Sequence, residues 1–178
     1  MDNTEYRSLA KFLHWSVVIL IAIQFVSSWL MPEFQRNMNP DFFLNAHMSF
    51  GLIIFPLAVA ALVVHFMYPV SKPEMNPPTL QGRAAAVMHY LLYALIFILP
   101  INGWAATSLG GIAVNVFGIF TLPVLFVQGS QISNILAETH SVLASTMGLL
   151  AMGHIGAALY HQVVLKDSVL QRMKPRIK

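Results

Sequence analysis

Cysteine is absent from this chain and charge is scarce, and both absences narrow what the protein can be. Without cysteine, the 178 residues can form neither a disulfide nor a thiolate-bound metal site. Charged residues make up 10% and apolar residues 57% of the sequence, whereas a soluble domain carries about 25% charged residues. This composition excludes a water-soluble monomer and indicates a protein that lies in a membrane.

Long uncharged runs give the number of membrane spans, because about 20 apolar residues cross the hydrocarbon core as a helix. The first run is Phe12–Pro32 and the second is Phe42–Ser71. No charge occurs between Arg83 and Glu138, but glycines and a proline interrupt this region after its first half, so we expect one helix followed by a long apolar connection. The sequence therefore predicts an all-α membrane protein with a single domain over residues 1–178, a bundle of four transmembrane helices at about 9–31, 42–68, 84–108 and 133–165.

The positions of lysine and arginine predict the orientation of these helices. Nine of the ten cationic residues lie at the N-terminus, in the Pro-rich loop around Pro69–Pro78 and its flank, or in the C-terminal tail, and only Arg36 lies on the other side. By the positive-inside rule, both the N- and C-termini are cytoplasmic. The excess of lysine and arginine is thus explained by the orientation of the protein in the membrane, and we expect no nucleic-acid partner.

Four histidines occur inside the uncharged stretches, where an ionisable residue is costly and indicates function. They are His14, His47, His140 and His154. His140 and His154 are fourteen residues apart on one expected helix, which places them roughly 21 Å apart and within about 40° of the same face. Depth pairs His14 with His154 in the cytoplasmic half, and His47 with His140 near the outer surface.

Ligation of one iron by each histidine pair is the simplest interpretation, since imidazole is a common axial ligand of haem. In the absence of cysteine the two haem b groups would be held noncovalently. His161 is an alternative partner for His14, but it would separate the irons by about 31 Å, the whole hydrocarbon thickness, so we favour His154. Small residues such as Gly51 and Gly148 leave room for a flat macrocycle, although they are also common where membrane helices pack.

The other three histidines have a simple structural interpretation, and two alternative functions can be compared with haem binding. His65, His89 and His161 lie towards the cytoplasmic ends of their helices, where hydrogen bonding to backbone or lipid headgroups is usual. A zinc site needs three or four ligands around one ion, and a typical cation transporter has carboxylates near the bilayer centre, which these helices lack. Metal transport is therefore disfavoured, whereas a membrane anchor that exchanges electrons with a soluble redox partner stays open.

Short segments at the helix ends carry a resemblance to a known family. They comprise Tyr6 with His14-Trp15, Asn45-Ala46-His47 with Gly51, Val116-Phe117-Gly118-Ile119 with Pro123, Glu138-Thr139-His140, His154, Lys166-Asp167, and Arg172-Met173 with Pro175. Over nearly its whole length the chain resembles the prokaryotic cytochrome b561 family. The resemblance implies a multi-pass protein of the bacterial inner membrane, a four-helix bundle in which two b haems each lie between two histidines.

The same resemblance implies an oxidoreductase that passes electrons between the quinone pool and a donor or acceptor at the outer face, and some members oxidise superoxide and reduce ubiquinone. We expect the quinone contact near the cytoplasmic haem, where His161 could bond a quinone carbonyl and exchange a proton, because imidazole titrates near neutral pH. A purely structural hydrogen bond by His161 is the alternative. Weaker candidates for quinone or propionate contacts are His89, Lys72 and Arg83.

Two departures from the family pattern bear on function. Family members usually carry arginine in the cytoplasmic half of the second helix, where this chain has Ala61 and His65, so the usual partners of the haem propionates are missing there. Members that oxidise superoxide resemble one another in a cationic outer face, yet the outer loops here carry a net charge of minus two, which repels an anion. These loops contain Arg36, Glu33, Asp41 and Glu138.

Overall fold

The computed structural model describes residues 3–67, 79–124, 131–167 and 170–173, and within them the fold is a bundle of long helices. The helices are α1 (Asn3–Leu30), α2 (Phe42–Met67), α3 (Leu80–Leu109) and α4 (Ile132–Tyr160). A span long and apolar enough to cross a membrane occurs in each of the four. The predicted all-α membrane fold with four transmembrane helices is therefore confirmed.

The helix bounds differ from the predicted ones mainly at the polar ends. The second helix agrees to within one residue, but α1 begins at Asn3 rather than near residue 9, and α3 begins at Leu80 rather than near 84. Thr79 explains the early start of α3, because its hydroxyl accepts the Gly82 N–H and caps the first turn. The Pro-rich loop predicted at Pro69–Pro78 lies outside the described residues.

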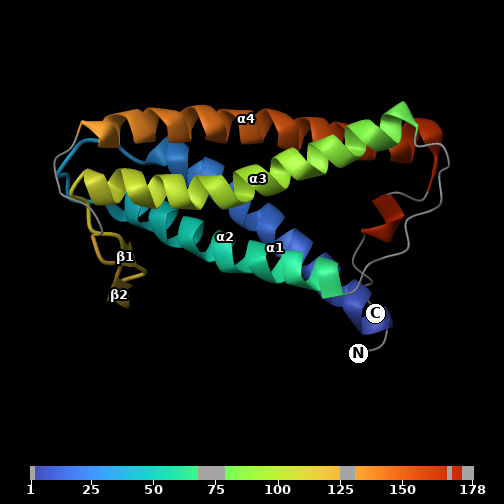
Figure 1. Ribbon diagram of the computed structural model, residues 1–178, viewed down its shortest axis with the longest axis horizontal. Helices are drawn as coiled ribbons and strands as arrows, with labels where there is room; N and C mark the ends of the chain where they lie inside the picture. Colours follow the sequence, from blue (N-terminus) through green and yellow to red (C-terminus); the bar gives the residue numbers. More distant parts are fainter. Residues whose placement is uncertain (1–2, 68–78, 125–130, 168–169, 174–178) are drawn as a thin grey trace.

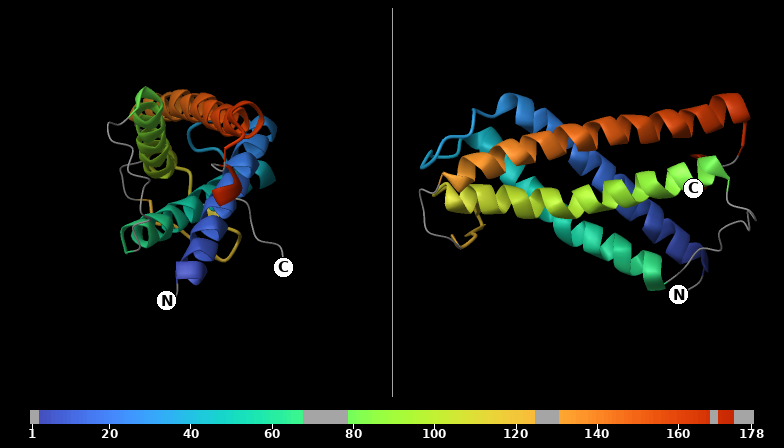
Figure 2. Two further views of the ribbon diagram at one scale, coloured as in Figure 1. Left: turned by 90° about the vertical axis from the view of Figure 1, so that its right-hand side faces the viewer. Right: turned by 45° about the horizontal axis from the view of Figure 1, so that its top comes forward.

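The four helices form two antiparallel pairs (Figures 1 and 2). α1 packs along α2 and α3 packs along α4, while α2 also contacts α3 and α1 barely touches α4. We call the end where α2 and α4 begin the outer end and the opposite end the inner end, after the orientation that lysine and arginine predict. The seam between the two pairs therefore runs the length of the bundle.

A β-hairpin lies in the connection between α3 and α4, where the sequence predicted only a long apolar segment. Its strands are β1 (Asn115–Val116) and β2 (Phe120–Thr121), paired antiparallel. Phe117 and Gly118 both have positive φ, 49° and 74°, as a tight hairpin turn requires. Fully buried Ser49 of α2 ties the hairpin to the bundle, because its Oγ accepts the Phe117 N–H at 3.0 Å and lies 3.2 Å from the Asn115 carbonyl oxygen.

At the inner end, α4 continues as a π-helical turn, His161–Leu165. Lys166 then adopts a left-handed conformation with φ 53°, which directs the chain back towards the helix. Beyond a short 3₁₀ turn at Leu170–Arg172, the Met173 carbonyl accepts the indole N–H of Trp15 at 2.9 Å. Met173, beyond α4, thus contacts the first half of α1.

Candidate functional site

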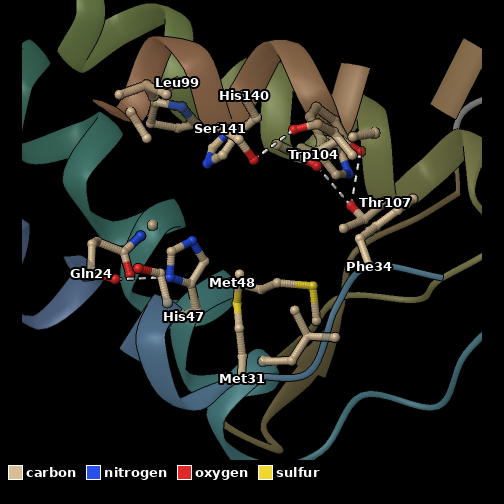
Figure 3. Close-up of a pocket in the computed structure, with 18 of the residues that line it drawn as sticks. Gln24, Met31, Phe34, His47, Met48, Leu99, Trp104, Thr107, His140 and Ser141 are labelled. Carbon is tan, nitrogen blue, oxygen red and sulfur yellow. Dashed lines mark hydrogen bonds between the residues drawn. The ribbon is translucent and has the colours of Figure 1, made fainter. Parts of the chain in front are cut away.

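A cavity of about 710 Å³ lies between the helices in the outer half of the bundle. This volume is in the range of small-molecule and cofactor sites. His47 from α2 and His140 from α4 face it from opposite walls (Figure 3). Because these two helices belong to different helix pairs, the cavity lies across the seam.

The separation of the two rings matches the space that one metal ion requires. The ring centres of His47 and His140 are 6.2 Å apart, and their planes meet at 72°. With a metal–imidazole bond of about 2.0 Å, two rings on opposite sides of one ion have centres roughly 6.3 Å apart. The outer pair therefore has the spacing of two axial ligands.

The surroundings of His47 decide which of its nitrogens is free. Its Nδ1 lies 3.2 Å from the backbone carbonyl oxygen of Gln24 and 3.0 Å from Ser27 Oγ, whose hydroxyl itself donates to that carbonyl. A carbonyl oxygen only accepts, so Nδ1 carries the hydrogen and Nε2 keeps its lone pair. Metal-binding histidines are commonly held in this way by a carbonyl at the far nitrogen.

Close approach to glycine shapes the cavity walls. The side-chain amide of Gln24 occupies the space over Gly51, because a Cβ there would lie 2.6 Å from Gln24 Nε2, so this glycine accommodates Gln24 directly. On the opposite wall a Cβ at Gly103 would lie 3.1 Å from Cε1 of His140. Gln24 Oε1 is buried without a hydrogen-bond partner among the described residues, whereas His140 interacts with the backbone of Leu99. An unpaired polar atom at such a cavity is consistent with a bound group.

The inner pair repeats the spacing of the outer pair. The rings of His14 on α1 and His154 on α4 have centres 6.5 Å apart and planes at 64°. A third ring approaches here, since His89 on α3 lies 5.2 Å from His154 at 80°. Depth alone predicted the proximity of His14 and His154, but the contact with His89 was missed because it depends on side-chain orientation.

His161 lies apart from both histidine pairs. Its Nδ1 is 2.5 Å from Oδ2 of Asp167, and both side chains remain partly exposed, at 30% and 38%. The π-helical turn makes this contact, because it places Asp167 beside His161 with its N–H on the His161 carbonyl at 3.2 Å. His65 is exposed on α2 and contacts Phe66.

Two further observations limit the chemistry of the site. In the part of the chain that the structure describes, no three histidine, aspartate or glutamate side chains are grouped closely enough to hold a metal ion, so a zinc centre of protein ligands alone is not supported. The carboxylates of Glu33 and Glu138 line the outer cavity. Among the described residues that line this cavity, the charged side chains are therefore acidic.

Comparison with known proteins identifies the family. The profile described as prokaryotic cytochrome b561 matches residues 5–176. The chain belongs to the prokaryotic cytochrome b561 family. It is a haem-binding electron-transport protein of the bacterial inner membrane with four transmembrane helices, and the family implies haem b as its cofactor.

Several relatives are similar over almost the whole chain. "Cytochrome b561 homolog 1" of Escherichia coli (strain K12) is 28% identical over 94% of this chain and 95% of its own length. The "Probable superoxide oxidase CybB" of Yersinia pestis is 29% identical over 98% of both chains. "Cytochrome b562" of Cereibacter sphaeroides is 27% identical over 96% of both.

The residues of this b561 cytochrome fit noncovalent haem b. The outer cavity has the volume for a cofactor, both histidine pairs have the spacing of axial ligands, and the chain has no cysteine for a covalent link. Each pair also joins two helices from different helix pairs, His47 and His140 at the outer end and His14 and His154 at the inner end. The donor set is therefore of the right kind at both depths.

Proposed function

We propose that this protein is a di-haem b cytochrome that carries electrons between a quinone at the inner end and a donor or acceptor at the outer end of the bundle. The observation that carries the proposal is the pair of inter-ring distances, 6.2 Å and 6.5 Å, at two depths of one membrane bundle. Both distances agree with the roughly 6.3 Å expected for two imidazoles on one ion. Haem supplies one-electron Fe(III)/Fe(II) chemistry when bound.

The protein's own groups provide binding and orientation in this proposal. His47 and His140 would hold the outer iron, and the Gln24 carbonyl keeps Nε2 of His47 available for it. His14 and His154 would hold the inner iron. Since the two sites are roughly 21 Å apart along α4, electrons can cross most of the bilayer within one chain.

We propose that quinone exchanges electrons and protons near the inner end at His161. Quinone reduction takes up protons, and His161 is partly exposed below the inner pair with its Nδ1 on the Asp167 carboxylate. With Nδ1–H donated to Asp167, Nε2 is free to accept a proton or to bond a quinone oxygen. Asp167 then fixes the orientation of the His161 ring that presents Nε2 to the quinone.

Superoxide is the second candidate substrate, at the outer end. The specific observation in its favour is the similarity to a relative named as a probable superoxide oxidase. The acidic side chains at the outer cavity oppose it, because they repel an anion. An electron-transfer anchor for a soluble redox partner is the remaining alternative, and it differs only in the donor or acceptor at that end.

The decisive experiment compares donors and acceptors on purified protein. Haem reduction is followed at the b-type absorption bands after addition of a ubiquinol analogue or superoxide, and reoxidation after addition of a ubiquinone analogue. We expect electron exchange with the quinone analogue, and we expect it to slow at least tenfold in His161→Gln while both haem spectra stay unchanged. His65→Gln is the matched control, because His65 is an exposed histidine on another helix. Exchange at the wild-type rate in His161→Gln would place the quinone elsewhere.

A further inference from the structure

The two proposed axial pairs differ in how their rings are held. At the outer end, the Nδ1–H of His47 has a carbonyl acceptor and a hydroxyl beside it. At the inner end, His14 and His154 make no side-chain hydrogen bond within the described ranges. Histidines on a metal almost always donate their second ring N–H to a nearby acceptor, which fixes the ring and raises its basicity. The inner pair therefore needs such an acceptor.

His89 is a polar side chain whose ring contacts that of His154. It lies on α3, and its Nδ1 is 2.7 Å from the backbone carbonyl oxygen of Ala85, one turn earlier. Since that carbonyl only accepts, Nδ1 of His89 carries the hydrogen and Nε2 keeps a lone pair. The His89 ring is thus fixed to its own helix and has one acceptor nitrogen unused.

The position of this ring excludes a second role as iron ligand to the same ion. The ring centres of His89 and His154 are 5.2 Å apart, about 1 Å less than the separation of two axial imidazoles, and the planes are nearly perpendicular at 80°. The structure shows a ring contact and no hydrogen bond between the two side chains. The distance between the ring centres nevertheless suits two imidazoles joined by one N–H···N bond, with about 2.9 Å between the nitrogens.

We propose that His89 is the positioning residue of His154, accepting its ring N–H and fixing the orientation of its ring at the inner haem. The inference rests on the proposed function, because it takes His154 as an axial ligand. An acceptor on the far nitrogen makes an imidazole more electron-donating, which favours ferric over ferrous iron and lowers the reduction potential. The reduction potential of the inner haem is then lower with His89 than it would be if His154 had no acceptor for its ring N–H.

Two substitutions separate hydrogen bonding from packing. His89→Phe keeps an aromatic ring for the edge contact and removes the acceptor, whereas His89→Gln removes the ring and keeps an acceptor. His65→Phe is the matched control, since His65 is also an exposed histidine near the inner end of its helix but contacts only Phe66 among the ring contacts of the described residues.

The measurement is a redox titration of both haems in the purified holoprotein, with the ferric low-spin electron paramagnetic resonance spectrum, which responds to the angle between axial rings. In His89→Phe we expect both haems to be retained and the inner haem to be about tenfold easier to reduce, an upward shift of about 59 mV for one electron. Its resonance signal should also change. His89→Gln should return the potential towards wild type, and His65→Phe should change neither property.

The proposal would be overturned if His89→Phe left the reduction potential and the resonance signal of the inner haem unchanged. It would also be overturned if the potential stayed at the wild-type value in His89→Phe but shifted in His89→Gln, because the potential would then depend on ring packing. Loss of the inner haem in both His89 variants would mean that His89 is itself a ligand, which is equally fatal. The failure of the proposed function is a separate result, namely wild-type protein with one haem, or His154→Ala with both haems intact.

Discussion

His47 and His140 face each other across the outer cavity, and the atoms behind each ring differ. His47 is held at Nδ1 by the Gln24 carbonyl and Ser27 Oγ, while the His140 ring interacts with the backbone of Leu99 and lies against Gly103. The glycine leaves just enough space for the His140 ring, since any Cβ would be 3.1 Å from Cε1. Position 103 therefore controls where the His140 ring can lie.

We expect Gly103→Val to displace the His140 ring and weaken the outer haem, while the inner haem is retained. The reason is steric, because the added carbons overlap the ring and a packed site moves only a few tenths of an ångström without cost. Haem content and the b-type spectrum measure the result. Gly156→Val is the control, since nothing lies within 4 Å of a Cβ at Gly156. Full outer haem in Gly103→Val would show that this wall is not tight.

The histidines that face each other could be predicted from the sequence, but the neighbouring groups that orient their rings could not. Helix depth is a property of residue number, so it predicted that His14 lies near His154. The Gln24 carbonyl behind His47 and the His89 ring beside His154 depend on helix rotation and side-chain torsion, which apolar runs do not determine. A pattern of small residues was equally uninformative, because the space over Gly51 is filled by a glutamine.

Among the elements, helices were predictable and short irregular pieces were not. Apolar runs mark where a chain crosses lipid, so α2 was predicted closely, but a helix can continue into water and α1 begins several residues before the apolar run. The π-helical turn at His161–Leu165 and the β-hairpin depend on tertiary contacts. Their sequences carry no Asp, Glu, Lys or Arg and are as rich in apolar residues as the adjoining spans, so composition does not set them apart.

The hairpin depends on one buried hydroxyl, and Ser49→Ala should loosen it. The substitution leaves the Phe117 N–H without its acceptor and costs about 1 to 3 kcal/mol. We expect faster amide hydrogen exchange in residues 115–121 and a lower unfolding temperature, with both haems still bound. Ser145→Ala, which removes an exposed hydroxyl bonded within α4, should change neither. Unchanged exchange in Ser49→Ala would show that strand pairing alone holds the hairpin.

On the scale of the whole molecule, the seam between the helix pairs is the main structural feature. α1 contacts α2 and α3 contacts α4, yet both proposed axial pairs join helices across the seam. The indole N–H of Trp15 also donates to the Met173 carbonyl, which links α1 to the segment after α4. Bound haem would therefore stabilise the association of the two helix pairs, by the general linkage of binding to folding.

Charge at the outer end gives a prediction for superoxide. If this protein oxidises superoxide, added salt should speed the reaction, because Glu33 and Glu138 line the outer cavity and salt screens their repulsion over a Debye length of about 10 Å at 0.1 M. Glu33→Gln with Glu138→Gln should raise the rate at low salt and flatten its salt dependence. The measurement is the initial rate of haem reduction by superoxide against ionic strength. A rate that falls with salt would show that local geometry outweighs these charges.

The central claim is that two haems lie between His47 and His140 and between His14 and His154, and haem stoichiometry in single alanine variants tests it most directly. We predict about half the wild-type haem in each variant, because one missing axial ligand strongly weakens noncovalent binding. The two outer variants should lose the same spectral component and the two inner variants the other. The account would be contradicted if His161→Ala abolished the inner haem while His154→Ala left it low-spin and six-coordinate.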